Sequence, residues 1–438
     1  MSKVRNPSLD LVRVIAGITV LGVHFFLYTG FYSETIDSPK MFLPVFVRTF
    51  MMVCVPLFMM LSGYLMNKKT LTRRYYRGIV KTLVMYFFSG VAGILFLIFY
   101  LKTPLTFGDI TFKFLEFSAA NYAWYVEMYI GLFMIIPFLN MGYHHIGSQK
   151  KKLVLVLTLC IMTALPSVLN TFDLVTTGWW ANPTISDKTY QIVPDYWTML
   201  YPITYYIVGS YLSEFPPKMS KLKAFVLLII SLTLFTVYNM YRSWGRGIHL
   251  GAWATWQGFE QLIDAALVLI ILSKVNLDGA PNWVKALLKK LSDLTLGIYL
   301  ISYIFDRSIY YDYFGKWVTD FKSRFVWYPV VVLCMYILSA AAAFVLSIFT
   351  NITVKLIFFI SDSVGRTIKN RSNSDDSEQL PEFEISADTE NFSAYSLSSD
   401  CDNNSAQLDD GKEKETEEQA ELVQTDFSTE QMVTTQDR

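Results

Sequence analysis

The chain has 438 residues, of which 53% are hydrophobic and only 17% are charged, against about 25% charged residues in an ordinary soluble domain. This composition excludes a soluble two-domain enzyme, a nucleic-acid-binding protein and a disulfide-stabilised scaffold. The formal net charge of zero averages two unlike parts. Residues 1–371 contain 34 Lys and Arg against 18 Asp and Glu, whereas residues 372–438 contain 3 against 19. The sequence therefore predicts a basic, apolar body followed by an acidic tail.

Ten segments are apolar over the length of about 20 residues that a helix needs to cross a bilayer. In chain order they are residues 9–31, 43–66, 79–101, 122–140, 153–170, 195–213, 224–240, 253–273, 291–310 and 328–350. One set of connections holds 21 basic residues and the opposite set holds 10, which predicts that the first set is cytoplasmic. Because the number of spans is even, both termini are expected in the cytoplasm.

We therefore expect an all-α membrane protein in the cell membrane, a bundle of about ten transmembrane helices over residues 1–360. The stretch 352–360 is too short to span, and we expect it to lie at the membrane interface. The tail over 361–438 is rich in Ser, Asp, Glu and Gln and predicts a cytoplasmic, mostly disordered segment. No cysteine or histidine spacing indicates a metal site.

The first predicted span carries ionisable residues, which are costly inside a bilayer and need a reason to be there. Arg13 and His24 are eleven residues apart, so they share one helix face at a separation of about 16 Å along the axis. This spacing predicts a fixed cation near the cytoplasmic end and a titratable imidazole in the outer third of the membrane. A lone histidine on an apolar face can equally be a satisfied core residue.

Three further spans place a charged residue at the depth of His24. Arg48, Glu127 and Glu260 each fall about 7–11 Å below the outer surface at helical rise. Together they predict one polar chamber, in which a carboxylate orients His24 and His24 acts as a general base toward a hydroxyl. The alternative is a set of buried ion pairs, Arg48 with Glu127 or Glu260, that only fixes helix packing.

Two other patterns bear on ligands. Arg74 and Arg77 lie one helical turn apart at the cytoplasmic start of the third span and could clamp phosphate oxygens, although a positive-inside loop would also contain them. Nine of the ten tryptophans, Trp124 and Trp256 among them, fall on or near the predicted outer side. They indicate aromatic surfaces for the flat faces of sugar rings, or else an interfacial belt that tyrosines complete on the inner side.

At this point several motifs resemble one family. They are Arg13 with ten residues before His24, VPLFMMLSGYLM around Ser62 and Gly63, Arg74-Tyr-Tyr-Arg77, WYVEMYIGLFMIIP around Glu127, and LTLGIYLIS at 294–302. Over about residues 5–355 they resemble the integral-membrane acyltransferase family 3. The resemblance departs at Ser302, where many members have a histidine. Some members carry a fused extracytoplasmic hydrolase-like domain, and because this C-terminus is a short acidic tail we do not expect the chain to belong to that subgroup.

The resemblance implies an acetyl-CoA-dependent O-acyltransferase of cell-surface polysaccharide or a related glycan, with no metal. By this carry-over Arg13 and His24 are the essential pair, Arg74 and Arg77 are the basic motif, and Glu127 is the acid of the fourth span. We expect the CoA phosphates on Arg74, Arg77 and Arg13. A direct transfer and a covalent acyl-His24 intermediate both remain open.

The expected partners are acyl-CoA, an extracytoplasmic glycan or lipid-linked sugar, and membrane lipids, but no nucleic acid. Arg48, Glu260, Trp124 and Trp256 are the predicted substrate-binding residues. A rival hypothesis is a secondary transporter or flippase for a glycan precursor, with the intramembrane carboxylates as proton sites. A third is a membrane sensor that signals through its acidic tail.

Overall fold

The structure, a computed structural model, describes residues 5–372. Every regular element in this part of the chain is helical, and one isolated β-bridge joins Ile36 and Trp244. The helices of the first half are α1 (Pro7–Tyr28), α2 (Phe42–Met51), α3 (Cys54–Met66), α4 (Arg73–Tyr76), α5 (Val80–Phe99), α6 (Phe107–Leu115), α7 (Trp124–His145) and α8 (Gln149–Thr163). The all-α prediction is confirmed for the described residues.

The second half continues with shorter helices and three long ones, α11, α13 and α16. They are α9 (Pro166–Leu169), α10 (Tyr201–Glu214), α11 (Lys221–Ser243), α12 (Phe259–Ser273), α13 (Asn282–Phe305), α14 (Gly315–Trp317), α15 (Phe321–Val326) and α16 (Tyr328–Ser372). A π-helical segment, Asp306–Phe314, extends α13 without a break. π-Helical segments inside helices are frequent at functional sites, and this one has nine residues.

Among the residues that the structure describes, seven stretches of helix are long and apolar enough to cross a membrane. They contain α1, α2 with α3, α4 with α5, α7, α11, α12 and α16. The other three predicted spans are also helical, but α8 has 15 residues and α10 has 14, and α13 carries charged residues in its first half. The prediction of ten spans and of two cytoplasmic termini stays a prediction.

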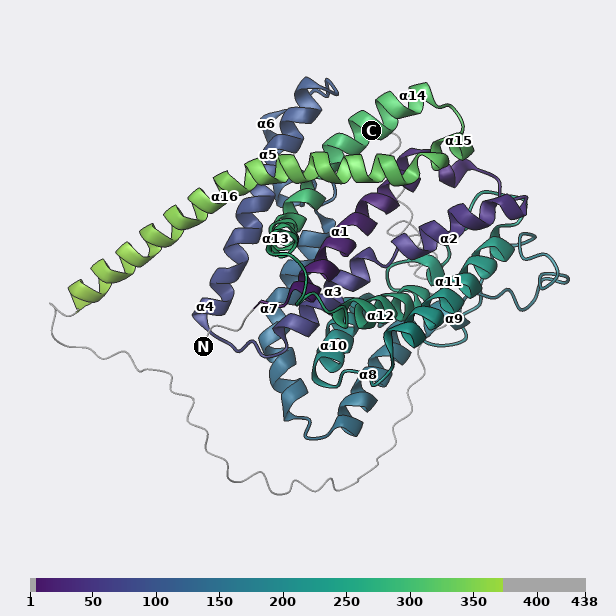
Figure 1. The fold of residues 1–438 in the computed structure, drawn as a ribbon, viewed down its shortest axis with the longest axis horizontal. Helices are drawn as coiled ribbons and strands as arrows, with labels where there is room; N and C mark the ends of the chain where they lie inside the picture. The colour runs from purple at the N-terminus through teal and green to yellow at the C-terminus, as the bar shows by residue number, and fades with distance from the viewer. Residues whose placement is uncertain (1–4, 373–438) are drawn as a thin grey trace, which may run out of the picture. The chain divides into compact units, whose positions relative to one another are not determined.

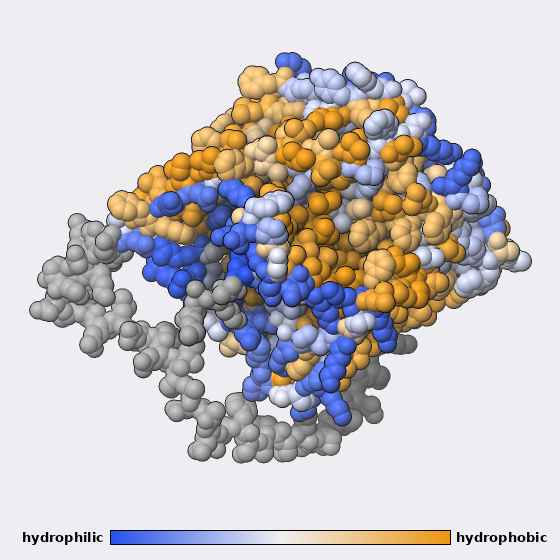
Figure 2. Space-filling model, in the orientation of Figure 1, coloured by the Kyte–Doolittle hydropathy of each residue, from blue (hydrophilic) through white to orange (hydrophobic). Residues whose placement is uncertain are grey.

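Large apolar side chains cover much of the outside of these helices. Phe87 and Leu95 on α5, Leu234 on α11, and Leu333 and Phe344 on α16 are between 43% and 64% exposed. Figure 2 shows apolar residues across the middle of the face in view and hydrophilic residues gathered toward its margins. Such a surface indicates a membrane protein, because a bilayer covers apolar side chains that water would not.

α1 lies at the centre of the described helices and packs against α2, α3, α12, α13 and α16 (Figure 1). It begins where the Asn6 side chain accepts a hydrogen bond from the backbone N–H of Ser8, with Pro7 at the first helical position, a favourable start for a helix. It ends before Gly30, whose φ of +86° turns the chain outward at little steric cost. α1 therefore holds Arg13 and His24 on a rigid, central element.

α3 and α10 approach each other backbone to backbone. A Cβ atom at Gly63 would lie 1.9 Å from the carbonyl oxygen of Tyr206, and one at Gly209 would lie 1.9 Å from that of Met60. Small residues allow this close packing between membrane helices. The Ser-Gly-Tyr motif of the sequence thus has a structural role, which is to seat α3 against α10.

α16 has no break near its C-terminal end. Residues 352–360 are helical and belong to α16, which continues through them to Ser372, and their position at the membrane interface stays a prediction. The predicted domain boundary at residue 360 therefore falls inside a helix. The predicted disorder of the acidic tail concerns residues that, after 372, lie outside the described part of the chain.

Candidate active site

The imidazole of His24 is paired with a carboxylate from the other end of the sequence. His24 Nδ1 lies 2.7 Å from Asp306 Oδ2, and both side chains are buried. A carboxylate only accepts hydrogen bonds, so this contact holds the ring proton on Nδ1 and leaves Nε2 as a free acceptor. The arrangement is that of a histidine base whose tautomer and orientation are fixed by an acid.

Two tyrosines complete the surroundings of this pair. The Tyr122 hydroxyl donates to the same Asp306 oxygen at 3.1 Å and lies 3.0 Å from the Tyr28 hydroxyl. The Tyr122 ring also packs against the His24 ring, with centroids 4.1 Å apart. The Tyr299 hydroxyl donates to the Tyr122 carbonyl and thereby anchors the end of the loop that precedes α7. The imidazole is held from its edge by a carboxylate and from one face by an aromatic ring.

Asp306 is not among the site residues predicted from the sequence. It lies within the predicted span 291–310, however, and the cost of a charge inside a membrane applies to it as it does to Arg48 and Glu260. The sequence predicted Glu127 as the acid instead. In the structure Glu127 is exposed and has no hydrogen bond or ion pair from its side chain to any described residue. Glu127 lies in the first turn of α7, whereas Tyr122, which packs on the His24 ring, lies in the loop before that helix.

Arg13 lies at the opposite end of α1, beside a cavity of about 990 Å³. Its guanidinium donates to the Ser292 hydroxyl of α13 at 3.0 Å. Arg13 and His24 thus both contact α13 or its extension, as residues on one face of α1 should. Arg5 and Lys68 also line the cavity, together with the acids Asp10 and Glu214. Arg5 is ion-paired with Asp10 and Asp293, so the cations without an ion pair to a described residue in this lining are Arg13 and Lys68.

Arg74 and Arg77 are not among the residues that line this cavity. Arg74 is exposed on α4. Arg77 forms an ion pair with Asp362 of α16 at 2.8 Å, and its guanidinium lies over the Phe358 ring. The two arginines therefore do not form a joint clamp with Arg13. The cations that share the cavity with Arg13 come instead from the N-terminus and from the loop after α3.

A row of aromatic rings connects the two ends of the site. From Tyr122, which packs on His24, contacts pass to Tyr299 at 6.3 Å and from Tyr299 to Tyr125 at 6.0 Å. Tyr125 stacks in turn on Tyr129 at 6.3 Å, and the Tyr129 hydroxyl lies within electrostatic reach of the Arg13 guanidinium. Tyr125 and Tyr129 remain partly exposed, although helices surround them.

Arg48 and Glu260 meet in a second buried cluster. Both side chains are fully buried, and the charge of Arg48 acts on the Glu260 carboxylate, but they form no direct ion pair. Glu260 accepts hydrogen bonds from Asn239 at 3.2 Å and Gln261 at 3.0 Å. The Nη1 and Nη2 atoms of Arg48 have no partner among the described residues. A buried, unpartnered guanidinium calls for a ligand or water.

Two of the predicted substrate-binding residues contact each other: the rings of Trp124 and Trp256 stack with centroids 6.2 Å apart. The Tyr205 hydroxyl donates to the Trp256 carbonyl at 2.6 Å, which fixes the position of that loop. Arg48 and Glu260, which the sequence predicts at one depth, therefore lie near each other, whereas Glu127 does not join them. No group of three or more His, Cys, Asp or Glu side chains in residues 5–363 is arranged to hold a metal ion.

Comparison with known proteins bears on this geometry. A family model described as an acyltransferase domain matches residues 6–348. This chain belongs to acyltransferase family 3. No curated protein and no solved structure matches it. The family match spans α1 to the first part of α16, so that Arg13, His24 and Asp306 all lie inside the acyltransferase domain.

Proposed function

We propose that the protein is a membrane O-acyltransferase that moves an acyl group, acetyl in the first instance, from cytoplasmic acyl-CoA to a hydroxyl of an extracytoplasmic carbohydrate. The observation that carries the proposal is the pair formed by His24 and Asp306 at one end of α1, opposite the Arg13 cavity at the other. Transfer from a charged cytoplasmic donor to an acceptor outside the cell requires a donor site at one end of the bundle and an acceptor site at the other.

The donor binds at the Arg13 end. The phosphates of CoA need cations, and Arg13 and Lys68 supply them in the lining of the cavity. The pantetheine arm carries the thioester along α1, past the half-buried rings of Tyr129 and Tyr125, for about 16 Å of helix. Arg74 and Arg77, which were predicted to bind phosphate, would contact the part of the CoA nucleotide that lies outside the cavity.

The chemistry takes place at His24. With Nδ1–H held by Asp306, Nε2 takes the proton from the acceptor hydroxyl as its oxygen attacks the thioester carbonyl carbon. The C–S bond then breaks, and the imidazolium returns the proton to the departing CoA thiolate. The carboxylate of Asp306 stabilises the imidazolium while it exists.

The acceptor binds at the same end of α1. The free Nη groups of Arg48 and the carboxylate of Glu260 can bind sugar hydroxyls, and the stacked indoles of Trp124 and Trp256 offer a flat apolar surface. Both sets were predicted as substrate-binding residues. Glu127, which is exposed, has no part in this scheme.

The test is transfer of labelled acetyl from acetyl-CoA to surface glycan in membrane vesicles. Wild-type protein should transfer label, and His24→Ala should abolish transfer while the protein still inserts and folds. Retained transfer in folded His24→Ala would remove the histidine from the mechanism. Absence of any CoA-dependent transfer by the wild type would favour the transporter hypothesis instead, and glycan mass analysis of a deletion strain would then show no lost acyl increment.

A further inference from the structure

A second cavity, separate from the residues described so far, opens on the loop surface near α11. It has a volume of about 530 Å³ and is lined by residues of two segments, among them Asn182, Thr184, Tyr241 and Trp244. This volume is in the range of about 300–1,000 Å³ that is usual for small-ligand sites. None of the lining residues is charged at neutral pH, so the cavity is suited to an uncharged ligand and not to a phosphate or to CoA.

The lining combines the two kinds of group that a sugar requires. The Trp244 indole is 48% exposed and gives a flat apolar face at the rim, whereas Asn182 and Thr184 are polar. The Asn182 Oδ1 atom accepts hydrogen bonds from the Thr184 hydroxyl at 2.7 Å and from its backbone N–H at 3.3 Å. This leaves the Asn182 amide nitrogen without a partner among the described residues, free to donate to a ligand hydroxyl.

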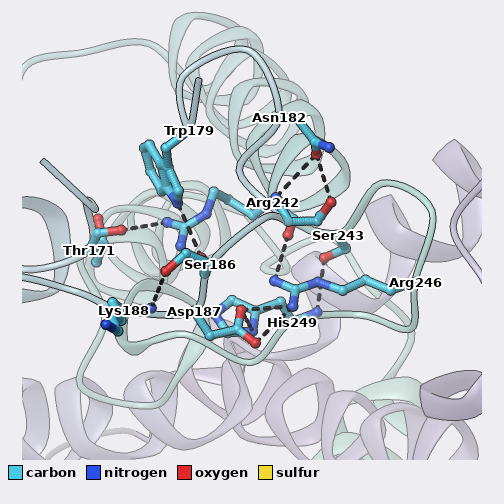
Figure 3. A network of polar contacts seen from close by, with 11 residues as sticks. Thr171, Trp179, Asn182, Ser186, Asp187, Lys188, Arg242, Ser243, Arg246 and His249 are labelled. Carbon is cyan, nitrogen blue, oxygen red and sulfur yellow. Dashed lines mark hydrogen bonds and ion pairs between the residues drawn. The ribbon is translucent and has the colours of Figure 1, made fainter. Parts of the chain in front are cut away.

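The loop that forms one wall is held in place by an unusual amount of polar and aromatic contact (Figure 3). The buried guanidinium of Arg242 lies between the rings of Trp179 and Trp253, at 4.8 and 4.3 Å from their centroids, and donates to the Thr171 carbonyl at 2.7 Å. The Trp179 indole N–H donates to the Ser186 carbonyl at 3.2 Å. Because these contacts hold the loop in place, the cavity is largely pre-formed, and this lowers the entropic cost of binding a ligand.

An ion pair ties the same loop to the other wall. Arg246 bonds to Asp187 at 2.7 Å, and the His249 ring lies 3.7 Å from the same carboxylate. Burial and the charge of Arg246 lower the pKa of His249 to about 4, so this ring is neutral at pH 7. These residues close the loop without placing a charge in the cavity.

The cavity lies at the His24 end of α1. Trp244 pairs with Ile36, and the Gly245 N–H donates to the Ile36 carbonyl at 2.8 Å. Ile36 lies in the loop that follows α1, eight residues after Tyr28, the last residue of that helix. Gly245 adopts a φ of +81°, a conformation that favours glycine and that shapes this rim.

We propose that this cavity binds one or more neutral pyranose units of the acceptor, away from the reacting hydroxyl, so that the acceptor is an oligo- or polysaccharide and not a monosaccharide. The inference rests on the proposed function, because it assigns the occupant as part of the acceptor. The flat face of one sugar ring packs on Trp244, and the amide of Asn182 binds its hydroxyls.

The experiment measures binding by titration calorimetry of the purified full-length protein in nanodiscs. The probes are neutral gluco-, galacto- and manno-hexasaccharides and the matching monosaccharides. We expect at least one hexasaccharide to bind more tightly than its monosaccharide. Trp244→Ala should raise its Kd about tenfold, which is the contribution of a lost aromatic stack, whereas Trp244→Phe should recover part of the affinity.

The matched control is Trp283→Ala, which removes a 69% exposed tryptophan from the start of α13 and should leave the Kd unchanged. His24→Ala should bind the hexasaccharide like the wild type and transfer nothing. Binding without any acetyl transfer by the wild type would refute the proposed function and leave the sugar site standing. Equal affinity of the wild type and Trp244→Ala, or no hexasaccharide binding at all, would overturn the sugar site.

Discussion

Replacement of Asp306 by asparagine is the sharpest test of the proposed site. The substitution keeps the size of the side chain and removes its charge. It therefore spares the packing around the π-helical segment and changes mainly the contact between Oδ2 and His24 Nδ1, which is 2.7 Å long and buried. If Asp306 fixes the tautomer of His24, the substitution should reduce the rate of acetyl transfer and leave donor binding intact.

The expected magnitude follows from this contact. A hydrogen bond to a charged group contributes about 1.5–3 kcal/mol, and each 1.4 kcal/mol is about tenfold in rate, so loss of the charge alone costs about 10- to 150-fold. An asparagine amide can also donate to Nδ1, which moves the ring proton to Nε2 and removes the base. Since general-base catalysis contributes at most about 10⁴-fold, we expect Asp306→Asn to lower kcat by about 10²–10⁴-fold.

The assay is initial-rate transfer from acetyl-CoA by the protein in nanodiscs, with kcat and the KM for acetyl-CoA determined separately. Glu127→Gln is the matched control, because it neutralises an exposed carboxylate on α7, and it should change kcat less than twofold. A folded Asp306→Asn protein with the kcat of the wild type would refute the role of Asp306. A selective rise in KM would place Asp306 in donor binding instead.

Three further substitutions test other parts of the structure. Gly63→Ala forces a Cβ to 1.9 Å from the Tyr206 carbonyl and should sharply reduce the yield and thermal stability of folded protein by fluorescence-detected size exclusion, whereas Gly131→Ala, which meets nothing within 4 Å, should not. Arg13→Gln should raise the KM for acetyl-CoA about tenfold or more through the loss of a charge-assisted phosphate contact; an unchanged KM would place the phosphates elsewhere. The pKa of His249, lowered to about 4, lies below the ordinary value of about 6.5, so the unfolded chain binds more protons between these values and the loop loses stability as pH falls from 6.5 to 4. Limited proteolysis of the loop should therefore accelerate over this range, and His249→Gln should flatten the response.

Composition and apolar length were sufficient to predict the class of this fold. They predict an all-helical membrane protein because a span must satisfy its backbone internally, and only helices do so segment by segment. They do not predict how a span ends. α16 runs through the residues assigned to the interface because nothing in that stretch stops a helix, and α13 became a 24-residue helix that starts before its apolar half.

The sequence predicts how deep each site residue lies in the membrane, but not the direction in which its side chain points. Helical rise gives the position of a residue along its axis, which is why Arg48 and Glu260 do meet. Which side of the bundle a helix presents depends on its neighbours, and the sequence alone did not supply that. Glu127 lies on α7 and Tyr122 lies in the loop just before it, and of these two residues only the tyrosine contacts His24. The same limit explains why Arg74 and Arg77 were grouped with Arg13.

Asp306 could have been identified from the sequence, because a charged residue inside any predicted span needs a reason to be there. It lies in an apolar span beyond the Gly-Ile-Tyr-Leu segment, four residues after Ser302, where many members of the family have a histidine. One helical turn separates these positions, so both can face the same space. In this acyltransferase the group next to His24 is thus an acid one turn further along. The departure at Ser302 accordingly does not leave His24 without a partner, because Asp306 supplies one from the same helical surface.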